Sequence, residues 1–494
     1  MSKALDQNIR DEVVEPKFSF VVEAPAGSGK TTLLADRILH LLTVVENPKE
    51  IIAISFTNKA ASEMHNKVEE RYNEKVNSKI KQKIETRAKK LKWNKKDKNL
   101  LDSLEIMTID SLASKITRQT PIVSRSLYKN ISDDPQEIYE ITAKVTMQNN
   151  SQLDKLFPFL NYDYQTIKNQ LIALLKKRDQ WQNAVFEYRE ISSNTIKNKT
   201  KKYYAQELKK WLKKINNIFS KEEKKDIKDI LTYLEPTFSK KESSIDFWLQ
   251  FKDLITNEKG KVRKTFTLTD GFLKNPEGIS YKDKLLNLIL NNNKINSTLE
   301  DFNDVLYEEK ILDIFPTIMP NTCILLSDLL IRLLQEFNIQ NQLDYIQVTD
   351  NAIYALEQKN IAIIFDENVS HILVDEFQDI DTQQEKFLKL LTQNFAGNPK
   401  KSFFAVGDPM QSIYRFRKGE VKIFKSLQTG KFGDLNLKSR QLKVNFRSNL
   451  KIINWLNTEY KKVFPDEDDI EIGALQYYQS SPNPNVKEDG NGIQ

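Results

Sequence analysis

A glycine-rich loop between a strand-like run and a helical run most limits how this chain can fold. Residues 21–32 read VVEAPAGSGKTT, and the helical pattern LLADRILHLL follows at once. The loop fits a phosphate-binding pattern with alanine in the first glycine position; its glycines let backbone N–H groups wrap a phosphate, and the helix N-terminus adds a positive dipole. Lys30 is expected to reach the β- and γ-phosphates of ATP, and the Thr31 hydroxyl to ligate Mg²⁺. A chance glycine-rich turn is the alternative, but the flanking strand and helix favour a nucleotide site. The predicted nucleotide-binding residues are Ala24, Pro25, Ala26, Gly27, Ser28, Gly29, Lys30, Thr31, Thr32 and, further along the helix, Arg37.

A second apolar run ends in acidic residues. Residues 371–379 read HILVDEFQD, and a buried strand does not end in two carboxylates unless something compensates their desolvation. Asp375 is expected to hold Mg²⁺, and Glu376 to orient and deprotonate an attacking water. An isolated Asp-Glu pair is usually a solvated turn. Together with the loop at 21–32, however, the pair predicts hydrolysis rather than binding alone.

Five apolar runs of strand length predict an α/β fold with a parallel sheet. They are residues 18–24, 50–56, 104–109, 371–376 and 402–408. Each run ends in small, polar or charged residues, and open α/β sheets place their ligand sites at the carboxyl ends of such strands.

The distribution of these runs predicts the domain organisation. Three runs precede residue 110 and two follow residue 370, and the stretch between them is glycine-poor and reads as Lys-rich amphipathic helices. A further strand-like run and a helical run follow residue 430, before a polar tail that is predicted to be disordered. The predicted parts are an ATPase domain of residues 1–117 and 346–430, a DNA-facing helical insertion of residues 118–345, and the beginning of a second domain at 431–494.

Composition narrows the class of protein and its compartment. The chain has 494 residues, of which 39% are apolar and 29% charged, and its net charge is +7. Dense basic runs at 75–98 and 196–214 suggest an anionic polymer as partner, although each alone fits a solvated helix face. Cys323 is the only cysteine, the N-terminus has no apolar leader, and the apolar run 323–334 is short and interrupted by charge. We therefore expect a cytoplasmic protein that is not embedded in a membrane.

Five motifs follow one another in a recognisable order. They are ISFTNKAASEM (54–64), MTIDSL (107–112), VDEFQD (374–379), VGDPMQSIYRFR (406–417) and VNFRSN (444–449). With the loop at 21–32, this set resembles the UvrD/Rep-type superfamily 1 DNA helicases, most closely the N-terminal helicase part of AddA/RecB-like helicase–nuclease subunits. The resemblance implies that the sheet is a RecA-like P-loop domain and that residues 431–494 begin a second RecA-like domain.

The resemblance also implies roles for individual residues. Gln411 resembles the glutamine that senses the γ-phosphate, Arg447 the arginine that a second motor domain offers to that phosphate, and Phe446 a ring that packs on adenine. A ring can stack on any base and a guanidinium can pair with phosphate, which suits binding without a particular sequence. The DNA-binding residues that the resemblance implies are Phe56, Thr57, Asn58, Thr108, Asp110, Ser111, Tyr414, Phe416 and Arg417.

The implied function is an ATP-dependent DNA helicase or translocase that uses Mg-ATP, acts in recombination and double-strand-break repair, and is expected to be truncated. Its implied partners are single-stranded or partly duplex DNA and a nuclease or helicase subunit. Two departures bear on this. Ile9 stands before Arg10 where the family has an adenine-reading glutamine, which leaves Gln7 as the candidate, and the rest of the second domain and the nuclease domain are lacking after Arg447. The alternatives are an ATP- and DNA-binding subunit without autonomous helicase activity, and a UvrD-like helicase of a phage-defence system.

Overall fold

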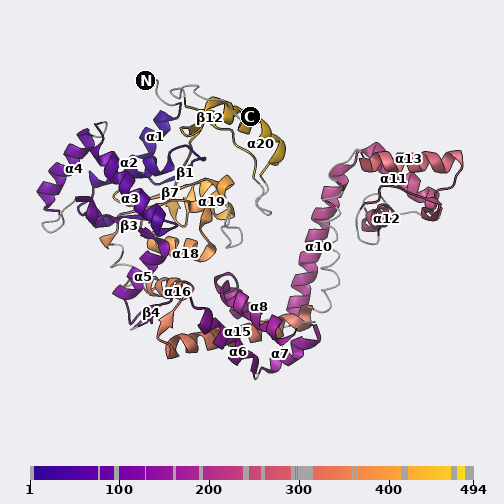
Figure 1. Ribbon diagram of the computed structural model, residues 1–494, viewed down its shortest axis with the longest axis horizontal. Coiled ribbons are helices and arrows are strands. Elements are labelled where there is room, and N and C mark those ends of the chain that lie inside the picture. Colours follow the sequence, from indigo (N-terminus) through magenta and orange to yellow (C-terminus); the bar gives the residue numbers. More distant parts are fainter. Residues whose placement is uncertain are drawn as a thin grey trace. The chain divides into compact units, whose positions relative to one another are not determined.

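The computed structural model divides the chain into two compact units (Figure 1). It describes residues 5–75, 78–93, 100–127, 129–148, 150–159, 163–188, 193–236, 244–257, 262–290, 295, 298, 315–358, 361, 365, 367–412, 421–468 and 475–483. The first unit comprises Met1–Ala143, Lys168–Trp181 and Arg332–Gln494, and the second comprises Lys144–Ile167 and Gln182–Ile331.

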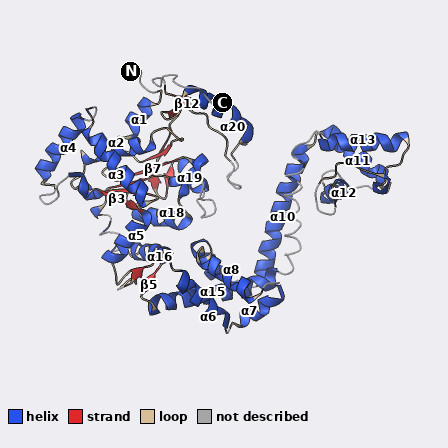
Figure 2. Cartoon of the chain, viewed as in Figure 1, coloured by secondary structure: helices blue, strands red, loops and turns tan. Residues whose placement is uncertain are grey.

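The first unit is built on a parallel sheet, whose strands are among those drawn red in Figure 2. The sheet has six strands in the order β10-β1-β7-β6-β2-β3. Its strands are β1 (Phe20–Glu23), β2 (Ile51–Ser55), β3 (Glu105–Thr108), β6 (His371–Val374), β7 (Ser402–Gly407) and β10 (Lys438–Gln441). The first five lie within the predicted runs. The predicted α/β fold with a parallel sheet is therefore confirmed.

Burial explains why these runs are continuously apolar. Every residue of β1, β2, β6 and β7 is buried, as expected for parallel strands that are covered on both faces. Val22, Ala53, Leu373 and Phe404 share one hydrophobic core with Leu34 of the helix after the glycine-rich loop. That core fixes the strand ends from which the polar loops emerge.

Helices flank the sheet of the first unit in two packed groups (Figure 1). Helix α2 packs against α3 and α4, and α16 packs against α5 and α18. The helices assigned wholly to this unit are α1 (Gln7–Val13), α2 (Lys30–Leu42), α3 (Asn58–Asn73), α4 (Ser78–Leu91), α5 (Ile109–Gln119), α16 (Tyr345–Leu356), α18 (Thr382–Leu391), α19 (Val421–Gln428) and α20 (Leu450–Val463). The predicted basic run 75–98 includes α4.

Short strand pairs complete the first unit. They are β4 (Asn130–Ile131) with β5 (Gln342–Leu343), β8 (Lys431–Phe432) with β9 (Leu435–Asn436), and β11 (Val444–Asn445) with β12 (Ser481–Pro482). Because β4 and β5 pair, segments near the two ends of the predicted insertion meet within the first unit.

The start of the predicted second domain differs from expectation. The sequence assigns residues 431–494 to that domain, but β10 joins the first sheet beside β1, with Phe20 opposite Lys438 and Glu23 opposite Gln441. The polar sequence of β10 gives no sign of this, because an edge strand needs only one backbone partner. The strand-like run predicted after residue 430, RQLKVNF at residues 440–446, is divided between two strands, β10 and β11, since the sheet ends at Gln441.

The second unit is helical and has an aromatic core of its own. Phe219 stacks on Trp248 at 5.6 Å between ring centroids, and Phe247 meets the same indole edge-on at 5.0 Å. Helix α10 spans the basic run 196–214 and buries Trp211 and Ile215 in this core. The helices that lie at least partly in this unit are α6 (Gln136–Gln148), α7 (Ser151–Leu156), α8 (Tyr164–Leu175), α9 (Gln182–Tyr188), α10 (Ser193–Ile218), α11 (Lys221–Leu234), α12 (Ile245–Ile255), α13 (Pro276–Leu290) and α15 (Phe315–Ile339).

The second unit is narrower than the predicted insertion of residues 118–345. Residues 168–181 fold with the first unit, where the fully buried guanidinium of Arg178 pairs with Asp344. Within α15, Ile318–Ile339 is long and apolar enough to cross a membrane by length and composition alone, a test that core helices of soluble proteins also pass. Leu329 and Leu333 of this helix are buried, as is Cys323.

Candidate functional site

The glycine-rich loop lies between β1 and α2 and adopts the conformation that its glycines allow. Gly27 and Gly29 have φ of 76° and 82°, in the left-handed region where other residues are strained. A Cβ on Gly27 would lie 2.6 Å from Asn445 Oδ1 and 2.9 Å from the Cβ of Arg447. Gly27 is thus required by both its backbone conformation and its neighbours.

The loop residues fit a bound phosphate. Gly29 is the N-cap of α2 and offers no side chain to the free N–H groups of the first turn, which is the arrangement of a helix N-terminus that receives an anion. The Ser28 hydroxyl is buried and has no hydrogen-bond partner among the described residues. Both features are explained if a nucleotide phosphate supplies the missing acceptor.

The end of β6 brings a carboxylate to this loop. Lys30 Nζ lies 2.8 Å from Glu376 Oε2, and Gln378 Nε2 donates to the same oxygen at 2.9 Å. Glu376 itself has φ of 47°, an uncommon value for a residue other than glycine. Such outliers cluster at functional sites, where the surroundings over-determine them. The Lys30 and Glu376 side chains, 346 positions apart in the sequence, therefore meet in the fold.

Asp375 lies in a setting that suits a cation. Burial, with repulsion from Glu376, raises the pKa of Asp375 to about 7. Within the described part of the chain, no group of three or more His, Cys, Asp or Glu side chains is arranged to hold a metal ion. In nucleotide sites Mg²⁺ uses one or two carboxylates together with phosphate oxygens and water. Thr31 and Asp375 remain its proposed protein ligands.

Asp408, at the end of β7, links the loop to Gln411. Its Oδ2 accepts a hydrogen bond from Ala26 N at 3.1 Å and another from the Gln411 side-chain amide. Burial raises the pKa of Asp408, and Lys30 opposes that rise. Gln411 is thereby held next to the phosphate-binding loop. Asp408 itself was not predicted, although its position after a buried strand was a usable signal.

The β11 segment is joined to the loop through its backbone and Asn445. Phe446 N donates to Gly27 O at 2.7 Å, and Asn445 Nδ2 donates to Ala26 O at 3.0 Å. The half-exposed ring of Phe446 lies 4.8 Å from the guanidinium carbon of Arg10. Gln7, the candidate for reading adenine, donates to Asp11. Within α1, Arg10 is the residue that lies against Phe446, the ring proposed to pack on adenine.

Arg37 does not share the surroundings of the loop and is a correction. Its guanidinium is fully buried and donates to the carbonyls of Val13, Glu15 and Phe18 and to the Ser402 hydroxyl. These contacts pair both terminal nitrogens of the guanidinium, whereas Nε has no hydrogen-bond partner among the described residues, and burial lowers the pKa of Arg37 to about 9. We therefore assign Arg37 to the packing of α2 and withdraw it from the nucleotide site.

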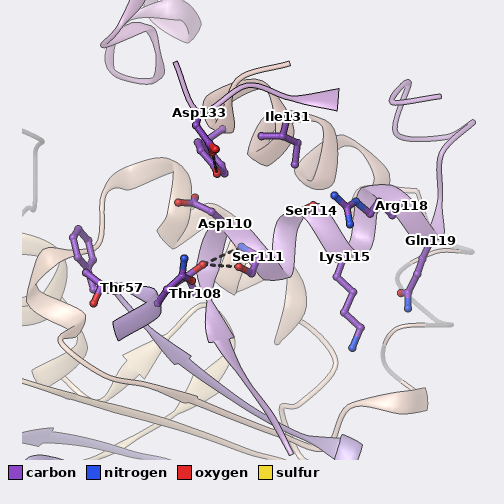
Figure 3. Close-up of a pocket in the computed structure, with 13 residues that line it drawn as sticks. Thr57, Thr108, Asp110, Ser111, Ser114, Lys115, Arg118, Gln119, Ile131 and Asp133 are labelled. Carbon is purple, nitrogen blue, oxygen red and sulfur yellow. Dashed lines mark hydrogen bonds between the residues drawn. The ribbon is translucent and has the colours of Figure 1, made fainter. Parts of the chain in front are cut away.

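A separate cavity of about 790 Å³ lies beyond the ends of β2 and β3 (Figure 3). Its lining includes residues of two motifs, at 54–64 and 107–112, that the resemblance assigns to DNA binding. Its lining residues are Phe56, Thr57, Asn58, Thr108, Asp110, Ser111, Ser114, Lys115, Arg118, Gln119, Ile131, Asp133 and Tyr345. We call this cavity the strand groove. The motifs themselves gave no sign of Ile131, Asp133 and Tyr345, because those residues come from β4, the turn after it and α16, which lie far from the motifs in the sequence.

Local capping explains how the groove residues are held. Thr57 Oγ1 accepts from Ala60 N at 3.1 Å and begins α3, and Thr108 Oγ1 accepts from Ser111 N at 3.1 Å and begins α5. Across the groove, Tyr345 Oη donates to Asp133 Oδ1 at 2.6 Å. Tyr414, Phe416 and Arg417, which the sequence also assigns to DNA, lie outside the described residues.

Comparison with known proteins identifies the family. Residues 5–431 match the UvrD/REP helicase N-terminal domain. Because the match covers most of the 494 residues, the chain belongs to this family, and the resemblance seen in the sequence is confirmed.

Similar proteins are much longer than this chain. An ATP-dependent helicase/nuclease subunit from Clostridium kluyveri is 25% identical over 520 residues, which cover 95% of this chain and 39% of that protein. The protein of the same name from Lactobacillus acidophilus is 25% identical, with 92% and 40% covered. That from Clostridium botulinum is 26% identical, with 93% and 39% covered. The chain thus spans about 40% of the length of these curated relatives.

Proposed function

We propose that this chain is the N-terminal motor portion of an ATP-dependent DNA helicase or translocase that acts in recombination and double-strand-break repair. The observation that carries the proposal is the meeting of Lys30, Glu376 and the Asp408–Gln411 pair at the carboxyl ends of β1, β6 and β7. The strand groove opens beyond β2 and β3 of the same sheet. One sheet therefore carries both a hydrolytic site and a surface suited to a nucleic-acid strand.

The proposed chemistry assigns one task to each polar group. Lys30 and Arg447 stabilise charge on the γ-phosphate, and Glu376 accepts the proton of the attacking water as the bond to the leaving phosphate breaks. Thr31 and Asp375 would hold Mg²⁺, which would neutralise charge on the phosphate oxygens when bound. Gln411 sits where it can respond to the γ-phosphate, because it shares Asp408 with the loop backbone.

The proposed substrate contacts lie in the strand groove and in the segment after Gln411. Phe56 offers a ring, Thr57, Asn58, Thr108 and Ser111 offer short polar groups, and Asp110 offers an acceptor. Tyr414, Phe416 and Arg417 extend this proposal on sequence grounds. A nuclease or helicase partner, which the helicase/nuclease names of the relatives support, is also part of the proposal, as is the cytoplasmic location expected from the sequence.

Mg-ATP hydrolysis with and without single-stranded DNA tests the proposal directly. We expect turnover that rises with DNA and falls by about 10²- to 10⁴-fold in Glu376→Gln, because that variant keeps the shape of the residue and removes the base. Nucleotide binding without DNA-stimulated turnover would contradict hydrolysis by this chain and favour a role in binding ATP and DNA alone.

A further inference from the structure

Gln378 holds a position that none of the roles above uses. Its side chain is buried, with 2% exposed, in the short helix Phe377–Asp379 that follows Glu376. The amide nitrogen donates to Glu376 Oε2 at 2.9 Å and to Asp379 Oδ2 at 3.3 Å. The amide oxygen accepts from Asp408 N at 2.9 Å. One side chain therefore joins the proposed general base to the loop that carries Gln411.

The surroundings of Gln378 leave room for this amide and for little else. A Cβ on Gly407 would lie 2.3 Å from Gln378 Oε1, although the Gly407 backbone is not in the left-handed region. The same Cβ would lie 2.9 Å from Cε2 of Phe424, so the amide and that ring together leave no space for a side chain at Gly407. The short helix is anchored as well, since the buried Phe377 ring packs edge-on against Phe403 and Phe432.

The contacts of Glu376 show what the amide can do. Its Oε2 receives two donors, Lys30 Nζ at 2.8 Å and Gln378 Nε2 at 2.9 Å. When Lys30 turns to a phosphate, Gln378 still holds that oxygen and fixes the direction of the carboxylate. The other end of the same amide is bound to Asp408, which contacts both Ala26 N and Gln411.

We propose that Gln378 is a positioning residue that couples the loop after β7 to the orientation of Glu376, and so makes hydrolysis depend on bound DNA. The inference rests on the proposed function, because it assigns regulation to the same site. An amide suits this position because it donates and accepts at once, whereas methionine does neither and a carboxylate only accepts. A glutamate here would add a further carboxylate beside Asp375, Glu376 and Asp379.

The test compares Gln378→Met with wild type in steady-state ATP hydrolysis, with no DNA and with saturating oligo(dT). We expect kcat with DNA to fall about 10²-fold, as for a misplaced catalytic group. The KM for ATP and the affinity for oligo(dT) should stay within about twofold, since the residue touches neither ligand. The ratio of turnover with and without DNA should fall towards one. Gln383→Met, on neighbouring α18 and bonded to Asp350, is the matched control and should leave all values unchanged.

Each outcome separates this inference from the proposed function. Wild-type protein without DNA-stimulated turnover would overturn the proposed function and the inference with it. A stimulated wild type with the same stimulation ratio in Gln378→Met would overturn only the inference, as would a raised KM with unchanged kcat. If Gln378→Met does not fold, Gln378→Glu keeps the shape and the acceptor but removes the donor. It should show the same loss of kcat and stimulation, and retention of both would count against coupling.

Discussion

The nucleotide loops and the strand groove lie at the same end of one sheet but are held in different ways. In the nucleotide loops, charged and polar groups find partners far away in the sequence, such as Lys30 with Glu376 and Ala26 with Asp408. In the groove, Thr57 and Thr108 bond to backbone groups three positions away. The first pattern concentrates partly buried charge, and the second consists of helix caps.

The helix caps of the groove can be explained by folding alone, whereas the partly buried charges of the nucleotide loops require a functional explanation. Helix caps stabilise a fold whether or not a ligand binds. Partly buried carboxylates with raised pKa values, such as Asp375 and Asp379 at about 7 and about 6, cost stability and call for a chemical reason. We therefore expect substitutions in the loops to affect turnover first, and substitutions of the groove caps to affect stability as well.

Lys30→Ala should give the largest effect. Removing the ammonium takes away both the proposed phosphate contact and the partner of Glu376, so Mg-ATP turnover should fall about 10³-fold or more. Steady-state hydrolysis with and without DNA measures it. Lys59→Ala, which removes one end of an exposed ion pair with Glu63, is the control and should be neutral. If Lys30→Ala and wild type had equal turnover, the nucleotide loops would not be the part of the protein on which turnover depends.

A buried pair outside the nucleotide loops, Arg178 with Asp344, offers a test in the opposite direction. Arg178 donates to Asp344 through both terminal nitrogens, at 2.6 and 2.5 Å, and Tyr139 donates to the same carboxylate. Arg178→Met leaves that carboxylate buried without its cation and should cost about 3–5 kcal/mol of unfolding free energy. Denaturant unfolding measures the loss. Turnover per folded molecule should not change. If Arg178→Met kept its stability but lost turnover, this pair would take part in the chemistry, as the pairs of the nucleotide loops are proposed to do.

The same pair should show in the pH dependence of stability. Burial alone would raise the pKa of Asp344, but Arg178 and Tyr139 outweigh burial and the pKa lies below its ordinary value. A lowered folded-state pKa contributes stability that is complete above the unfolded value of about 3.9 and is lost as pH falls through the folded value. The stability difference between wild type and Asp344→Asn should therefore be constant near neutral pH and shrink in acid. A constant difference down to about pH 2 would contradict the assignment.

The sequence predicted the parallel sheet and the meeting of its loops because both depend on local patterns. Continuous apolar runs mark covered strands, and glycines before Lys30 mark a loop that wraps an anion. The sequence did not predict that β10 extends the first sheet, because the pairing of Phe20 with Lys438 is a tertiary contact between distant segments. It also misassigned Arg37, since a charged residue in a helix next to a nucleotide loop looks functional until its backbone acceptors are seen. Gln378 and Asp408 were missed as partners for the same reason.

Thr57→Ala should have an intermediate effect that separates the two roles of a groove residue. Loss of the bond from Ala60 N to Thr57 Oγ1 should cost about 1 kcal/mol of unfolding free energy. Thr57→Ser keeps the cap and is the matched control. Weaker binding of single-stranded DNA in Thr57→Ala, with stability restored in Thr57→Ser, would measure how much the cap contributes to the groove. Unchanged stability in Thr57→Ala would show that the cap is not what holds this residue.

Arg118→Ala should give the smallest effect and the sharpest view of the groove. Arg118 is exposed on α5 at the groove, whereas Lys115 of the same helix pairs with Glu105 at 2.7 Å. If Arg118 contacts one phosphate, its loss should weaken binding by about 0.2–1 kcal/mol, the range of an exposed ion pair. The slope of log affinity against log salt should drop by about 0.7, the value for one phosphate contact on a single strand. Lys115→Ala should change that slope less, because Glu105 already neutralises its charge. An identical slope in wild type and Arg118→Ala would mean that the groove holds bases or protein rather than the phosphate backbone, and the groove would then differ from the nucleotide loops in ligand as well as in construction.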